Sequence, residues 1–112
     1  MGTRLGAPAL AALLSYTPAI AEEAHRLANS KELGVEIDAM GGEGWCRQRL
    51  SLTFHAKDAT VYPTAEFANL LKKLKQVLET ECPQAQHADL RGLDANGTWV
   101  HHGSISFSNG EL

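Results

Sequence analysis

The clearest pattern of apolar and polar positions lies between residues 64 and 81. Apolar side chains recur there every three or four residues, at Phe67, Leu70, Leu71, Leu74, Val77 and Leu78, which is typical of one face of an amphipathic helix. Thr64, after Pro63, is suited to cap the start. Cys82 precedes Pro83, and a residue before proline is pushed out of the helical region. We therefore predict one main helix over residues 64–81.

A different pattern, strict alternation of apolar and polar residues, appears in four shorter segments. Alternation with a period of two is typical of strands that are buried on one face only. The segments are residues 35–40, 45–56, 87–92 and 99–107. Glycine-rich residues 40–44 join the first two, and the turn signal at residues 94–97 joins the last two. The chain therefore contains two predicted hairpins, one on each side of the main helix.

Residues 22–33 have Ala24, Leu27 and Ala28 at helical spacing and are followed by Gly34, a residue that commonly ends helices. They predict a short N-terminal helix. The predicted fold class is α+β, with two layers in the order αββαββ. A four-stranded, mostly antiparallel sheet packs on the main helix (64–81) and is accompanied by the short N-terminal helix. Residues 22–112 form one small domain, because the chain is too short for a second core.

The first 21 residues are predicted to be a signal peptide. Arg4 is their only charged residue, Leu5 to Leu14 are largely apolar, and Ala19-Ile20-Ala21 offers small residues before a cleavage point. The apolar stretch is too short to cross a bilayer, which takes about 20 residues, so we expect no transmembrane anchor in the mature form. The alternative is an Ala/Leu-rich helix that packs on the domain, although Pro18 would kink it. A cleaved leader predicts a periplasmic or secreted protein.

The two cysteines, Cys46 and Cys82, are predicted to form a disulfide. Paired cysteines are common in small exported domains. Cys46 has the same strand parity as Leu50 and Phe54, which we expect to face the main helix, and Cys82 lies at the end of that helix. The alternative is a pair of buried free thiols in a cytosolic protein.

The charge balance argues against a nucleic-acid partner. Ten Lys and Arg residues against thirteen Asp and Glu residues give a net charge of −3. Nucleic-acid binding depends on clustered positive charge. The one cluster of lysines lies on the exposed side of the predicted helix. We therefore expect another protein as the partner, or a second copy of the chain paired through edge strands.

The sheet face that points away from the main helix is predicted to be unusually polar. It would carry Glu36, Asp38, Arg49, Ser51, Thr53, His55, His87, Asp89, Arg91, His102 and Ser104. We interpret it as a candidate binding face. His55, His87 and His102, with Asp38 or Asp89, are an alternative site for zinc or copper. The third interpretation is a solvated sheet face without a role, since antiparallel sheets commonly have one.

Catalytic motifs are not evident in the sequence. A disulfide removes both candidate thiol nucleophiles, and no catalytic residue is assigned. Trp45 and Trp99 are candidate hot spots for a partner, or else cover the ends of the core. We expect an exported, non-catalytic binding module such as an inhibitor, adaptor or subunit, acting through the polar sheet face or an edge strand. A metal-binding protein and a cryptic hydrolase or lyase are the alternatives.

Overall fold

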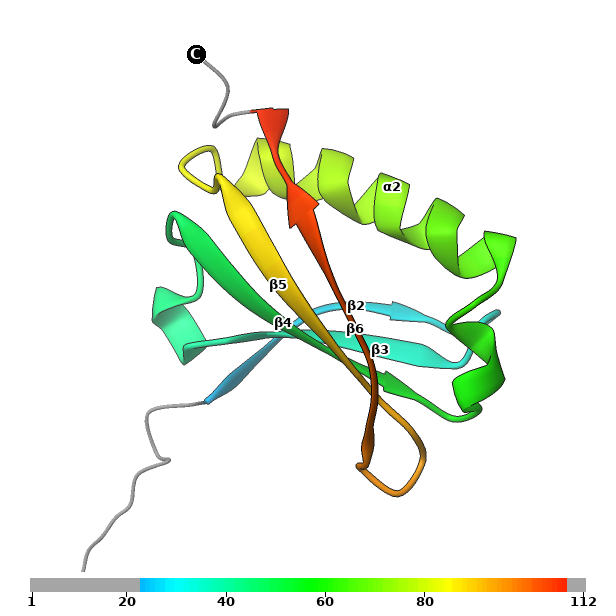
Figure 1. Cartoon of the computed structure of the whole chain (residues 1–112). Helices are drawn as coiled ribbons and strands as arrows, with labels where there is room; N and C mark the ends of the chain where they lie inside the picture. Colours follow the sequence, from blue (N-terminus) through cyan, green and yellow to red (C-terminus); the bar gives the residue numbers. More distant parts are fainter. Residues whose placement is uncertain (1–22, 109–112) are drawn as a thin grey trace, which may run out of the picture.

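Five strands form one mixed sheet, and one α-helix packs against a face of it (Figure 1). The computed structural model describes residues 23–108, so the predicted leader, residues 1–21, lies outside the described residues. The strands lie side by side in chain order and are β2 (Ala24–Ser30), β3 (Val35–Met40), β4 (Arg49–Ala56), β5 (His87–Leu93) and β6 (Trp99–Ser106). The helix α2 spans Ala65–Glu81 and connects β4 to β5.

The observed sheet corrects the predicted fold class. It has five strands where four were predicted, and it is mixed where a mostly antiparallel sheet was predicted. Neighbouring strands are antiparallel except β4 and β5, which are parallel. The reason is the connection, because a strand reached through a crossover helix returns in the same direction as the strand before it.

The predicted N-terminal helix over residues 22–33 is wrong, since β2 occupies this segment and pairs with β3. A bulge at Leu27 shifts the register between Arg26 and Ala28. One extra residue in a strand breaks the period of two. Because of the bulge, Leu27 and Ala28 are both half-buried although they are consecutive residues. Two consecutive apolar residues on one side are also what an amphipathic helix shows.

The main helix was predicted correctly, with its caps. The Thr64 hydroxyl accepts a hydrogen bond from the Phe67 backbone N–H at 3.2 Å, and Cys82 is the C-cap residue. Phe67, Leu74 and Leu78 are buried against the sheet. Phe67 contacts the Phe54 ring edge to face, with 5.4 Å between ring centroids. Apolar residues of the covered sheet face complete the core: Val35, Ile37, Ala39, Leu50, Leu52, Phe54, Ala88, Leu90 and Phe107.

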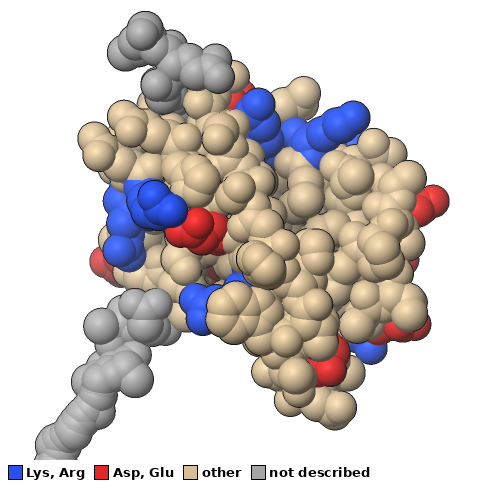
Figure 2. Space-filling model, viewed as in Figure 1, with Lys and Arg blue, Asp and Glu red and all other residues tan. Residues whose placement is uncertain are grey.

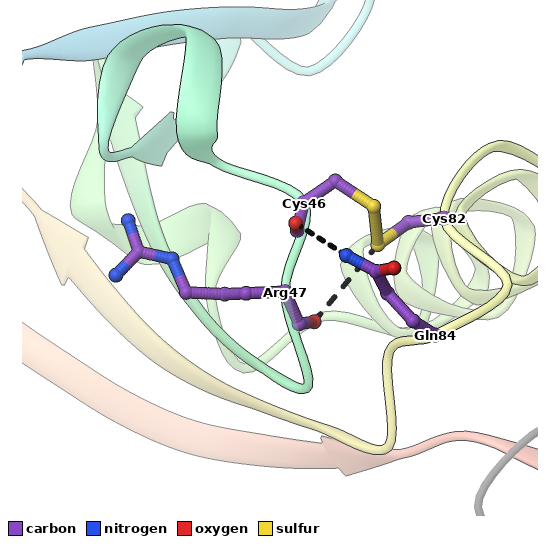
Figure 3. Close-up of a disulfide and its surroundings, with 4 residues drawn as sticks. All are labelled: Cys46, Arg47, Cys82 and Gln84. Atoms are coloured by element: carbon purple, nitrogen blue, oxygen red, sulfur yellow. Dashed lines mark hydrogen bonds between the residues drawn. A yellow bond between two sulfur atoms is a disulfide. The ribbon is translucent and has the colours of Figure 1, made fainter.

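The disulfide between Cys46 and Cys82 is present, although Cys46 does not lie on a strand. The predicted second strand, residues 45–56, begins only at Arg49. The preceding residues form a 3-10 turn (Gly42–Gly44) and a loop. Figure 3 shows the bond linking this loop to the end of α2, with the side-chain amide of Gln84 donating to the Cys46 carbonyl at 2.7 Å.

Candidate binding face

One face of the sheet is left open, because α2 covers only the other and the described residues form no second layer. We call this surface the open face. Strand pairing aligns one row of polar side chains across all five strands. The row runs in register through Arg26, Asp38, Thr53, Arg91 and His102. The other predicted polar residues flank this row: Glu36, Arg49, Ser51, His55, His87, Asp89 and Ser104.

Asp38 is the centre of the first ionic group on the open face. Its side chain is only 8% exposed. Its carboxylate accepts from the Arg26 Nε at 2.5 Å and lies 3.2 Å from the His55 Nε2. Glu36 also pairs with Arg26 at 3.3 Å. Arg26 is a member of the face that the sequence did not predict, because its segment had been interpreted as a helix.

Asp89 is the centre of the second ionic group, on β4 and β5. Arg49 donates from Nε and Nη2 to the two Asp89 carboxylate oxygens, at 2.9 and 3.3 Å. The His87 Nε2 lies 3.3 Å from the same carboxylate. The hydrogen bonds and charge of Arg49 lower the pKa of Asp89. Arg49 therefore balances Asp89, whereas Arg26 is shared by two carboxylates in the first group. Figure 2 shows positive and negative side chains interspersed over the visible surface.

Arg91, Trp99 and His102 form a third group, which we call the Trp99 patch. The Arg91 guanidinium lies over the Trp99 indole, 5.6 Å from its centroid, and its Nη2 reaches the Ser51 hydroxyl at 3.5 Å. His102 approaches the indole edge to face at 6.3 Å. Trp99 itself is 60% exposed. Among the described residues, Arg91 has no carboxylate partner, unlike Arg26 and Arg49.

Strict alternation along β6 would put Trp99 on the same side of the sheet as His101. In the structure a bulge interrupts the pairing of β5 and β6 near Leu93. His101 remains on the covered side, where its ring stacks on Tyr62 at 5.0 Å. The extra residue at the bulge turns Trp99 toward Arg91 instead.

Trp45, the other predicted hot spot, lies elsewhere. It precedes Cys46 in the loop before β4, is half-buried and packs against the core. Its ring stacks on His25 of β2, with 5.5 Å between centroids. The two tryptophans therefore do not form one surface.

The three histidines proposed as metal ligands are spread over the open face. His55 is in register with Leu93, six positions from His87, which corresponds to roughly 20 Å along the strands. His102 is in register with Arg91, four positions from His87, or roughly 13 Å. Within residues 23–108, no group of three or more His, Cys, Asp or Glu side chains is placed to hold a metal ion. The structure does not bring the predicted zinc or copper ligands together.

An open groove of about 830 Å³ lies at one end of the sheet. It is lined by the β2–β3 turn, the end of β4 and the β5–β6 turn, and it includes Lys31, Glu36, His55, Lys57 and Asp94. Its charges are mixed, and Glu36 and His55 are already engaged with Arg26 and Asp38. The groove extends the open face without adding a distinct chemical group.

Comparison with protein-family models, curated proteins and solved structures gives no match for this chain. No helix in the part of the chain that the structure describes is long and apolar enough to span a bilayer.

Three carboxylates with lowered pKa values predict a loss of stability in acid. Hydrogen bonds from Thr60 lower the pKa of Asp58, the backbone N–H of Ser108 lowers that of Glu79, and Arg49 lowers that of Asp89. A pKa that is lower in the folded protein stabilises it above the unfolded value, about 4. The free energy of unfolding should therefore fall as the pH drops below about 4 and these carboxylates protonate.

Urea unfolding at a series of pH values between 7 and 2 measures this dependence. The variant Asp89→Asn is the control, because it should show a shallower acid loss than the wild type. Equal pH dependence in the two proteins would remove Asp89 from the explanation.

Proposed function

We propose that this protein is an exported, non-catalytic binding module that engages another protein through the open face, with the Trp99 patch at the centre of the contact. The observation that supports this proposal most directly is Trp99, a large apolar side chain that is 60% exposed and lies beside an arginine. Tryptophan and arginine dominate binding energy at protein interfaces, and they cluster at interface centres. A sheet that merely faced solvent would have no need of this exposed indole.

The charges indicate what the partner presents. Arg26 and Arg49 are paired with carboxylates on the open face, whereas the contacts of Arg91 within residues 23–108 are with the Ser51 hydroxyl and the Trp99 indole. A guanidinium binds a carboxylate through two parallel hydrogen bonds. The partner is therefore a protein surface that offers an Asp or Glu side chain to Arg91 and an apolar contact to Trp99.

The disulfide supports the export part of the proposal. A bond between Cys46 and Cys82 persists in an oxidising compartment and is rare in the cytosol. A periplasmic or secreted location agrees with it. Intact mass of the purified native protein tests this part directly, because it reports the processed start and the thiol state together. A native protein that retains Met1 and two free thiols would contradict it.

Replacing Trp99 by alanine is expected to release the partner. Truncation of a central interface tryptophan costs about 2 kcal/mol or more, roughly a thirtyfold rise in Kd. The measurement is a quantitative pulldown from periplasmic or culture extract, followed by titration with the purified partner. Arg91→Ala should weaken the same complex, and Arg91→Lys should restore it only in part because lysine lacks the planar fork.

Val77→Ala is the matched control. Val77 is an exposed apolar residue (48%) on α2, away from the open face, so its truncation should leave binding unchanged. Lys73→Ala serves the same purpose for Arg91. A stoichiometric partner retained by both control variants and lost with Trp99→Ala supports the proposal. A partner whose Kd is unchanged by Trp99→Ala and Arg91→Ala contradicts it.

A further inference from the structure

The strand β6 forms one edge of the sheet, and part of its backbone faces outward. The Phe107 N–H donates to the Gln86 carbonyl at 3.1 Å, in the same register as the β5–β6 pairs. Hydrogen-bonded and non-hydrogen-bonded pairs alternate along an antiparallel ladder. The backbone groups of Gly103 and Ile105 therefore point to β5. Those of His102, Ser104 and Ser106 point away from it, to the free edge.

This edge lacks the usual protection against pairing with another strand. Natural edge strands are commonly shielded by charged side chains, prolines or bulges. Trp99–Ser106 contains no Lys, Arg, Asp, Glu or Pro. Its bulge lies at the Trp99 end, so His101–Ser106 pairs regularly with β5. The opposite edge, β2, carries Arg26 and has its bulge near the middle.

Gly103 lies in the middle of this edge without an internal reason to be glycine. A Cβ atom added there would meet only the Leu90 Cδ1, at an ordinary 3.9 Å, and the backbone φ is not in the left-handed region. Glycine inside a strand weakens it, and often marks the close approach of another chain or a ligand. A side chain at position 103 would point to the face of the sheet that α2 covers. Gly103 itself is exposed.

We propose that two copies of this chain pair β6 with β6, antiparallel and centred on Ser104. In this register Ser104 faces its own copy, His102 faces Ser106, and Ile105 of each chain fills the space above Gly103 of the other. The strand is complementary to itself, because Gly103 and Ile105 flank Ser104, so that the small residue of each copy lies opposite the large residue of the other. No like charges meet, and the two open faces join into one continuous surface.

The test introduces charge at the centre of the pairing. Ser104 is exposed on the open face, so Ser104→Lys and Ser104→Glu should fold normally, which circular dichroism and thermal melting verify. The two residues at position 104 would then face each other, with about 5.5 Å between their Cα atoms. Two like charges would lie side by side at the centre of the contact. We expect the wild type to sediment as a dimer, each variant as a monomer, and an equimolar mixture of the two variants as a heterodimer.

A second variant tests the space above Gly103. Gly103→Val adds a residue that favours strands, so the melting temperature of the monomer should not fall. The valine side chain would occupy the space that Ile105 of the other copy fills, so the variant should not form the dimer. Gln76→Lys, on the exposed side of α2, is the control and should remain dimeric.

A wild type that is monomeric in sedimentation overturns the proposal. So does a dimer that survives Ser104→Lys or Gly103→Val, or a mixture of the Lys and Glu variants that stays monomeric. Pairing through β6 does not depend on the proposed partner protein. Trp99→Ala should keep the dimer while losing the partner, which separates the two conclusions.

Discussion

Replacing both Cys46 and Cys82 by alanine is expected to lower the free energy of unfolding by about 3 to 4 kcal/mol. The disulfide joins residues 36 positions apart, and closing a loop of that length removes much of the conformational freedom of the unfolded chain. A small domain has a stability of about 5 to 15 kcal/mol in total. The loss is therefore large enough to leave the variant partly unfolded at physiological temperature.

The disulfide fixes a part of the chain that lies outside the regular strands and the helix. It links the end of α2 to the loop before β4, a segment without strand pairing of its own. The polar contacts beside the bond include the Gln84 hydrogen bond to the Cys46 carbonyl (Figure 3) and those from the Gln86 and His87 backbone N–H groups to the Gln48 carbonyl. Without the disulfide, these hydrogen bonds and the packing of Trp45 against the core would have to hold the loop near the helix end.

Urea denaturation of the oxidised wild type, the reduced wild type and the double variant measures the effect. Alanine is the replacement because Cys82 is fully buried, and a serine there would add the separate cost of an unpaired hydroxyl. The reduced wild type should lose about as much stability as the double variant. A loss below about 1 kcal/mol in both would contradict the loop-closure explanation.

The parts of the fold that were predicted correctly have local signals. The helix α2 has a long apolar period, a side chain that caps its start and a residue before proline at its end, all within 20 positions of sequence. The β5–β6 hairpin has alternation on both sides of Asp94-Ala95-Asn96-Gly97, and Asp94 accepts hydrogen bonds from the Asn96 and Thr98 backbone. Such features depend only on neighbours in the chain.

The parts that were not predicted depend on distant residues. The strand β2 is fixed by its pairing with β3, and its bulge removes the alternation by which a strand is recognised. The parallel pairing of β4 with β5 follows from how the crossover helix packs, which an isolated pattern of apolar residues does not specify. Both features arise from tertiary pairing rather than from local preference.

For the open face, alternation was enough to group the polar residues of β3, β4 and β5. It could not show which of them meet. Asp38 lies among Arg26, Glu36 and His55 because three strands are in register, and Trp99 joins Arg91 because a bulge reverses its side. Neither relation has a signature in the local sequence, so the Asp38 group and the Trp99 patch became visible only in the structure.

Replacing Gly92 by alanine is expected to destabilise the fold by about 1 to 3 kcal/mol. An added Cβ would lie 2.8 Å from the Tyr62 Cζ and 2.9 Å from the His101 Cβ, both far inside ordinary contact distance. The Tyr62 ring cannot move aside easily. Its hydroxyl donates to the Leu93 carbonyl at 2.6 Å, and its ring packs against Phe67 at 5.1 Å. The new methyl group must therefore displace β5, β6 or the Tyr62 ring.

Thermal and urea unfolding of Gly92→Ala, compared with Gly44→Ala, distinguish crowding from any general effect of losing a glycine. A Cβ at Gly44 would meet no atom within 4 Å, so that variant should stay within about 0.5 kcal/mol of the wild type. In the background Tyr62→Leu, which removes the ring, Gly92→Ala should cost less than in the wild type, and the difference is the coupling between the two positions. Equal costs in both backgrounds would show that the Tyr62 ring is not what requires glycine at this point of β5.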